Sequence, residues 1–231
     1  MNKRARRLLP LAAALSLTCS SVSCYATAEW EYKAGQVVNV DQGLSPDRRY
    51  AIAATEDATG KFSLLLIDGI TRKRIGPLME VTEPLDTAPE AFHAEWAPDS
   101  RHVAIWYRTD RHIQNLFIYR IENRRAYPVT GPDLLNLAAR TTSTHDLDIH
   151  SAVYSVKWRD AGHFAMSKSG NIRLAEGDKT TITALGKFGR FDSDAPNDIN
   201  FSIDAVCELA NDDRYRVLSF VPGAFWKGAA L

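Results

Sequence analysis

One short pattern occurs twice in the chain and limits what it can fold into. The segment Glu95–Trp106 reads Glu-Trp-Ala-Pro-Asp-Ser-Arg-His-Val-Ala-Ile-Trp, and Leu44–Ala53 repeats its order of apolar residue, Pro-Asp turn, basic residue and strand. Proline pre-sets the backbone for the first central position of a type I turn, and Asp and Ser side chains bond to nearby amides. β-Branched and aromatic residues after each turn favour strands. Each copy is therefore predicted to be the bend of a β-hairpin.

The spacing of the prolines indicates duplicated structural units. Pro46 and Pro98 lie 52 positions apart in the two turns. Pro77 and Pro128, which follow the next predicted strand of each copy, lie 51 positions apart. Two landmarks that keep almost the same spacing favour a repeat over chance turns.

Two weaker copies raise the expected count to four. Trp158–Met166 keeps the tryptophan and the turn without the proline, and Leu209–Leu218 has Asn211 in place of the proline. Two strand pairs about every fifty residues are typical of a propeller blade, a four-stranded antiparallel sheet. We therefore expect an all-β fold of about four such units, in a small or partial β-propeller. A closed ring, an open partial ring and a half-ring completed by a homodimer all fit this count.

The two better copies resemble a known repeat. Trp-Ala-Pro-Asp-Ser-Arg-His-Val-Ala and Leu-Ser-Pro-Asp-Arg-Arg-Tyr-Ala-Ile are similar to the Trp-Ser-Pro-Asp-Gly-Lys-x-Leu-Ala repeat of the TolB-like β-propellers of bacterial envelopes. Ser100 and Arg48 stand where that repeat has its turn glycine, and the copies are too few for a six-bladed ring. The resemblance implies a propeller fold and a periplasmic location, and it carries no catalytic residues. The repeat residues that we expect to be structural are Pro46, Asp47, Trp96, Pro98, Asp99 and Trp158.

Residues 1–28 have the pattern of a cleaved signal peptide. A basic start, an apolar run too short to span a bilayer and a small-x-small cleavage site follow one another at Lys3–Arg7, Leu8–Leu17 and Ala26–Ala28. We therefore expect Sec-type export and a single mature domain, residues 29–231, that is periplasmic or secreted. Twin-arginine export and lipidation at Cys19 or Cys24 are the alternatives.

The composition of the mature chain narrows its partners. Cys207 is its single cysteine, so no internal disulfide is expected and a buried, small apolar role is predicted. The full chain has 28 basic and 28 acidic residues, and the leader removes only basic ones. The slightly acidic remainder argues against nucleic acid or an anionic membrane surface as partner. After the leader, no apolar run is long enough to span a membrane.

Residues 131–151 form the longest stretch without strand character. Gly131-Pro132-Asp133, followed by spaced apolar residues, predicts a capped short helix. Insertions of this size in repeat proteins often lie on the binding face. The partner-binding residues that we expect are Leu134, Leu137 and His145 in this insertion, and Trp106 on a strand.

Two segments are candidates for metal ions. In an extended chain Asp146, Asp148 and His150 point to one side and offer oxygen and imidazole ligands to a divalent metal. A solvated loop with local Asp turns is the alternative interpretation. The segment Asp192–Asp198 begins like a calcium loop, but it lacks the glycine and the closing glutamate of that loop. No other cofactor is predicted.

The sequence contains no common catalytic motif. Gly-x-Ser-x-Gly, His-Glu-x-x-His, nucleotide-binding glycine loops and Cys-x-x-Cys are all absent. We therefore expect a non-catalytic exported protein that binds a protein partner. The alternatives are an inhibitor or immunity protein against a secreted toxic enzyme, and a metal-dependent hydrolase that uses residues 143–150.

Overall fold

A computed structural model describes residues 30–81, 85–140, 147–174, 184–191, 195, 197–210 and 213–224 of the 231-residue chain. Within these ranges the fold is all-β, with one short α-helix, α1 (Leu134–Ala139), and two 3-10 helices, η1 (Pro89–Ala91) and η2 (Gly186–Phe188). None of the described helices is long and apolar enough to cross a membrane. The predicted fold class is therefore confirmed at the level of an all-β chain.

The first two groups of strands are four-stranded antiparallel meanders. The first meander contains β1 (Val37–Leu44), β2 (Tyr50–Glu56), β3 (Phe62–Asp68) and β4 (Arg74–Glu80). The second contains β5 (Phe92–Trp96), β6 (His102–Arg108), β7 (Gln114–Glu122) and β8 (Arg125–Val129). β1 and β5 pair in parallel at Asp41 and His93, which joins the meanders into one eight-stranded sheet. Its end strands, β4 and β8, also contact each other, so this sheet nearly closes like a barrel.

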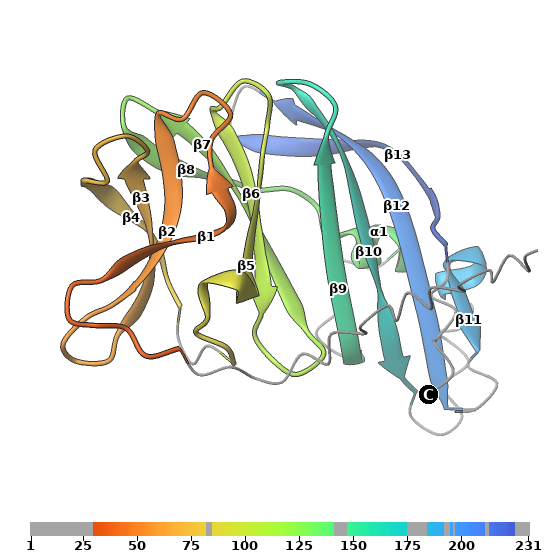
Figure 1. Ribbon diagram of the computed structural model, residues 1–231. Coiled ribbons are helices and arrows are strands. Elements are labelled where there is room, and N and C mark those ends of the chain that lie inside the picture. The colour runs from red at the N-terminus through yellow and green to blue at the C-terminus, as the bar shows by residue number, and fades with distance from the viewer. Residues whose placement is uncertain are drawn as a thin grey trace, which may run out of the picture.

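The third meander forms a separate sheet. It contains β9 (Asp148–Trp158), β10 (His163–Arg173), β12 (Asp198–Ala210) and β13 (Arg214–Pro222), all antiparallel to their neighbours. The short β11 (Gly189–Phe191) pairs with the first part of β12, on the edge that β13 occupies further along. Figure 1 shows the three meanders side by side in chain order, from orange through green to blue.

The described strands form three meanders, whereas the sequence predicted about four units. The backbone N–H groups of Gly69, Ile121 and Leu209 occupy equivalent places, because each donates to a carbonyl in the first turn of its own meander, at 2.9, 2.6 and 2.8 Å. Leu209 therefore lies near the end of a third strand, and the segment Leu209–Leu218 is the last hairpin of the third meander. The predicted third and fourth copies belong to one sheet.

The Pro-Asp turns close as the sequence predicts. The Arg48 N–H donates to the Ser45 carbonyl at 2.9 Å, and the Ser100 N–H donates to the Ala97 carbonyl at 3.0 Å. Arg48 and Ser100, which replace the glycine of the resembling repeat, have left-handed backbones with φ of 61° and 57°. Glycine adopts this conformation without steric cost, whereas other L-residues pay for it. Both turns therefore have the left-handed backbone of a glycine turn, although arginine and serine adopt it at a steric cost.

Two tryptophans connect successive meanders. The Trp96 indole N–H donates to the Gly43 carbonyl at 2.9 Å, and the Trp158 indole N–H donates to the Glu95 carbonyl at 2.8 Å. Gly43 and Glu95 are equivalent, since each precedes the last residue of its meander's first strand. Leu44 occupies the tryptophan position in the first meander and is 36% exposed. Each tryptophan therefore packs back onto the preceding unit.

Two apolar cores lie between the meanders, so the second meander is buried on both faces. Residues of the first and second meanders form one core, with Ile52, Leu64, Phe92 and Ile105 among its fully buried side chains. The opposite face of the second meander and the inner face of the third form the other core with α1. Cys207 is fully buried in that core, where burial raises the pKa of its thiol to about 12.

Helix α1 lies where the sequence predicted a capped helix, and it is held from its N-terminus. The Asp133 carboxylate accepts hydrogen bonds from the backbone N–H groups of Leu135 and Asn136, as an N-cap does. The same carboxylate pairs with Lys168 of β10, which is 4% exposed. Burial alone lowers the pKa of Lys168, but Tyr154 and Asp133 offset it, so the pKa lies above its usual value. The helix is therefore fixed to the third meander.

Candidate binding pocket

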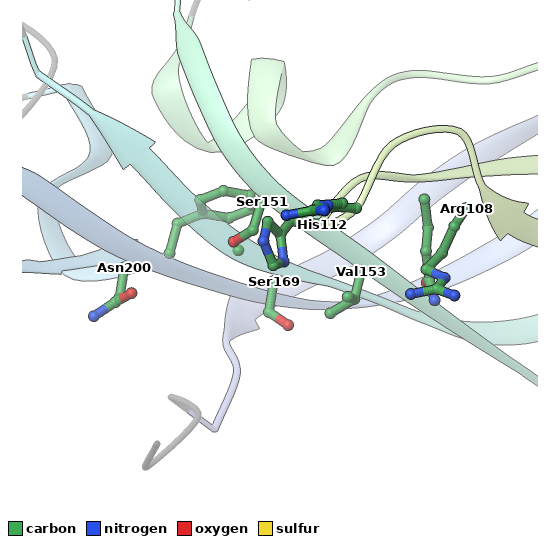
Figure 2. A pocket seen from close by; sticks show the side chains of 10 residues that line it. Arg108, His112, Ser151, Val153, Ser169 and Asn200 are labelled. Carbon is green, nitrogen blue, oxygen red and sulfur yellow. The ribbon is translucent and has the colours of Figure 1, made fainter. Parts of the chain in front are cut away.

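A pocket of about 430 Å³ lies where the β6–β7 hairpin meets the third meander. The hairpin contributes Arg108, Arg111, His112 and Gln114, and the strands β9, β10 and β12 contribute two residues each: Ser151, Val153, Ser169, Gly170, Asn200 and Phe201. Figure 2 shows the labelled side chains spread along the pocket, with Asn200 and Arg108 at its two ends. Cavities of this size hold small ligands or a few residues of a peptide.

Backbone pairing fixes the hairpin beside β9. Ile113 forms a parallel bridge with Ala152, and the Ala152 N–H donates to the His112 carbonyl at 2.8 Å. One step further along, the Tyr154 N–H donates to the Gln114 side-chain oxygen at 2.8 Å. The Gln114 amide thus takes the place of a strand carbonyl at the edge of β9. The wall of the pocket is therefore positioned by main-chain bonds.

The floor of the pocket is the outer face of the third meander. Ser169 is the register partner of Val153, and these two residues share the face that is turned away from the core. Gly170 allows β9 and β10 to approach closely, because a Cβ atom there would lie 1.9 Å from the Ser151 carbonyl oxygen. Val153 is 45% exposed, and Phe201 is buried beneath the floor. The pocket therefore offers apolar contacts between small hydroxyl groups.

The rim of the pocket is cationic. Arg108 pairs with the buried Asp86 at 3.0 Å, so its charge is compensated. Arg111 is exposed, and no hydrogen bond or ion pair of its guanidinium occurs within the described ranges. The exposed His112 lies beside His150, with ring centroids 5.8 Å apart, and neither ring has a carboxylate partner in the described part of the chain.

The other described histidines differ from this pair. His93 contacts Asp41 at 2.6 Å, His102 contacts Asp99 at 2.9 Å, and His163 contacts Asp160 at 3.0 Å. Each of these imidazoles therefore has a carboxylate to balance a proton. Among the described histidines, only His112 and His150 lack a carboxylate partner within the described residues, and His112 lines the pocket.

A second pocket, of about 420 Å³, lies at the opposite end of β6 and is lined by four arginines. Carboxylates compensate three of them: Arg49 pairs with Asp47, Arg124 with Asp68, and Arg120 with Asp213. The hydrogen bond from Arg120 outweighs burial and holds the pKa of Asp213 below its usual value. This cluster joins β7 to the β12–β13 turn, and we interpret it as structural.

The residues predicted to bind a partner do not form one surface. Leu134 is 1% exposed in the core beneath α1, and Leu137 packs against the same core. Trp106 is partly buried against this core and lies 4.3 Å, centroid to centroid, from the His93 ring. His145 lies outside the described residues. The apolar positions of α1 face inward, so Leu134 is not accessible from the surface in this structure, and partner binding by these residues stays a prediction.

The predicted metal ligands are only partly described. Asp146 and the segments 192–194 and 196 lie outside the described residues. Asp148 is exposed at the start of β9, opposite Arg173, and His150 is exposed beside His112. No group of three or more His, Cys, Asp or Glu side chains gathers within the described ranges. A divalent metal at Asp146, Asp148 and His150 stays a prediction.

The pocket residues carry no motif that marks them in the sequence. Arg111 and His112 form a polar tip between two predicted strands, which reads as an ordinary solvated turn. Their opposite wall comes from β9, β10 and β12, up to ninety residues later in the chain. The one available signal was the clustering of all six histidines between His93 and His163.

The chain has a weak likeness to a solved structure. No family model matches the chain, and no curated protein matches it. Among solved structures, the chain is similar to TolB from Acinetobacter baumannii, with 12% sequence identity and a TM-score of 0.33. The match covers 79% of this chain and 40% of that protein, so the chain spans less than half of its length. At this level the likeness bears on neither the activity nor the partners of the chain.

Proposed function

We propose that this chain is a non-catalytic, exported binding protein that recognises a protein partner through the pocket and the outer face of the third meander. The observation that carries the proposal is the open pocket with an exposed Val153 on its floor and the exposed Arg111 on its rim. Exposed apolar side chains next to a pocket mark interaction sites more often than isolated ones do. We propose in addition that the three meanders correspond to blades of a partial β-propeller.

The third meander carries further exposed apolar side chains. Leu218 and Val221 of β13 are 50% and 54% exposed. Val221 is the register partner of Asp204, whose neighbour across β10 is Ser167. Ser167 and the exposed Asp204 therefore lie between Val221 and β9, which carries Val153. A face with spaced apolar and polar side chains beside a pocket suits a partner that inserts one segment and rests against the sheet.

The serines of the pocket bear on the non-catalytic part of the proposal. Ser151 and Ser169 line the pocket together with His112, yet no hydrogen bond joins either hydroxyl to the imidazole among the described residues. A serine nucleophile needs such a contact with its general base. This observation supports a binding role for the pocket.

A pull-down from periplasmic extract tests the proposal. The tagged full chain should capture one stoichiometric partner, and Val153→Arg should abolish the capture, because a long cationic side chain would fill the pocket floor. Ile70→Arg is the matched control, since Ile70 is 76% exposed in the β3–β4 turn, away from the pocket. Equal capture by both variants would place the binding surface elsewhere, and no capture by the folded wild type would remove the proposal.

The identity of the partner then separates two forms of the proposal. An enzyme whose activity is lost in the complex would make the chain an inhibitor or immunity protein. A partner without such activity would make it a structural or assembly factor. Export is tested separately, because the chain recovered from the periplasm should begin at Glu29 by mass spectrometry.

A further inference from the structure

We infer that the pocket recognises an anionic group joined to an apolar body, which the protein partner presents as a carboxylate beside an apolar side chain. The inference rests on the proposed function, since it takes the occupant to be a segment of that partner. It adds the chemistry by which the segment is selected.

The charges around the pocket favour an anion. None of its described lining residues is acidic, whereas Arg111 and His112 stand exposed at the rim with His150 beside them. Three acidic residues lie on neighbouring segments, outside the lining of the pocket. Asp86 pairs with Arg108, the Asp110 carboxylate accepts the backbone N–H of Arg111, and Asp148 lies at the start of β9.

An arginine without a carboxylate is the typical receptor for one. The guanidinium presents its N–H groups in a planar fork that matches the two oxygens of a carboxylate. Elsewhere in this chain, arginines at Arg49, Arg120 and Arg124 already hold carboxylates. The exposed guanidinium of Arg111 lines the pocket and can bind a carboxylate in the same way.

The floor selects the rest of the ligand. Val153 offers apolar contact, because it is 45% exposed on the outer face of the sheet. Ser151, Ser169 and Asn200 add groups that can accept or donate a hydrogen bond. An apolar side chain of the partner fits between these groups while its carboxylate reaches Arg111.

Two fluorescent probes with nearly the same aromatic body test the inference. 1-Anilinonaphthalene-8-sulfonate carries an anion, and N-phenyl-1-naphthylamine does not. Titrated against the full chain, the sulfonate should bind more tightly than the neutral probe. Arg111→Ala should weaken sulfonate binding by about tenfold, the effect of one charged hydrogen bond, and should leave the neutral probe unchanged.

Two further variants make the test specific. Arg111→Lys keeps the charge and should retain most of the affinity for the sulfonate. Arg101→Ala removes an exposed arginine at the opposite end of β6 and should change neither probe. Sulfonate affinity that is the same in Arg111→Ala and the wild type, or that falls equally for both probes, would overturn the inference.

The two proposals can fail separately. A partner that is captured by the wild type and by Arg111→Ala alike would retain the binding function and reject the anionic contact. Probe binding that depends on Arg111, without any captured protein, would retain the anion site and reject a protein partner. In that case native mass spectrometry of the purified chain should reveal a small anionic amphiphile.

Discussion

Lys168 and Asp133 form an ion pair between the middle of β10 and the N-terminus of α1, where the lysine side chain is 5% exposed and the aspartate side chain 32%. The pair is asymmetric. Asp133 also caps the helix and reaches solvent, whereas Lys168 depends on this partner and on the Tyr154 ring, 5.2 Å from its ammonium. The two halves of the pair should therefore differ in what their removal costs.

We expect Asp133→Ala to destabilise the chain more than Lys168→Met. The first change leaves a buried ammonium without its carboxylate and also removes the helix cap, for a total of about 3–5 kcal/mol of unfolding free energy. The second leaves a capped, partly solvated aspartate and keeps the aliphatic packing, so it should cost about 1–2 kcal/mol. Urea denaturation measures both values. A larger loss for Lys168→Met would show that the ammonium contributes more than the helix cap.

Arg48→Gly should stabilise the chain. Arg48 is exposed with a φ of 61°, and relief of the left-handed backbone outweighs the added chain entropy by about 0.5–1 kcal/mol. Ser100→Gly should gain less at the equivalent position, because the Ser100 hydroxyl accepts the Asp47 N–H at 3.0 Å. Thermal unfolding of both variants tests this order. Equal gains would mean that the Ser100 hydroxyl contributes little.

Trp158→Phe should lower the free energy of unfolding by about 1–3 kcal/mol, although the ring stays apolar. The change removes the indole N–H and leaves the Glu95 carbonyl without its donor between two packed meanders. Trp96→Phe should have a similar effect at the Gly43 carbonyl. Denaturation curves with unchanged slopes would confirm a local loss. A negligible change in both variants would argue that water replaces the donor.

Stability should fall at alkaline pH. Burial raises the pKa of Cys207 from 9.0 to about 12 and that of Tyr119 from 10.0 to about 12. The unfolded chain therefore releases these protons first, so their contribution is complete below about pH 9 and declines as the pH rises toward 12. Cys207→Ala should reduce the slope of unfolding free energy against pH in this interval. An unchanged slope would exclude the thiol as a contributor.

The same burial predicts the reactivity of Cys207. At pH 8 the folded chain should not react with a disulfide reagent over hours, whereas the chain in urea should react at the rate of a free thiol. The absorbance of the released thiolate follows this reaction. Rapid labelling of the folded chain would show that the core beneath the third meander opens readily.

Local chemistry made some parts of the fold predictable. The turns at Pro46 and Pro98 and the cap of α1 depend on residues adjacent in sequence, and the structure has them where the sequence indicates. The number of meanders depends on which hairpins pair with each other. Leu209–Leu218 has the same local pattern as a first turn, but its strands continue the sheet begun by β9.

The candidate site was not predictable for the same reason. The spacing of the apolar residues in α1 indicates a buried helix face. We expected Leu134 to bind a partner because α1 lies in an insertion, and insertions often form binding surfaces. Arg111 and His112 gain their significance from Val153 and Ser169, which only the pairing of Ile113 with Ala152 brings near. A sequence pattern reports residues that are close along the chain, whereas the lining of this pocket comes from four segments that only the fold brings together.

The tryptophan hydrogen bonds make the two ends of the row of meanders different, because each bond runs from one meander to the meander before it. The second meander therefore both donates such a bond, from Trp96, and accepts one, at the Glu95 carbonyl. Lys157 holds in the third meander the place that Gly43 and Glu95 hold in the first two. A duplication that lengthened this protein would therefore succeed most readily after β13, with a new tryptophan aimed at Lys157, whereas an addition before β1 would meet only Leu44.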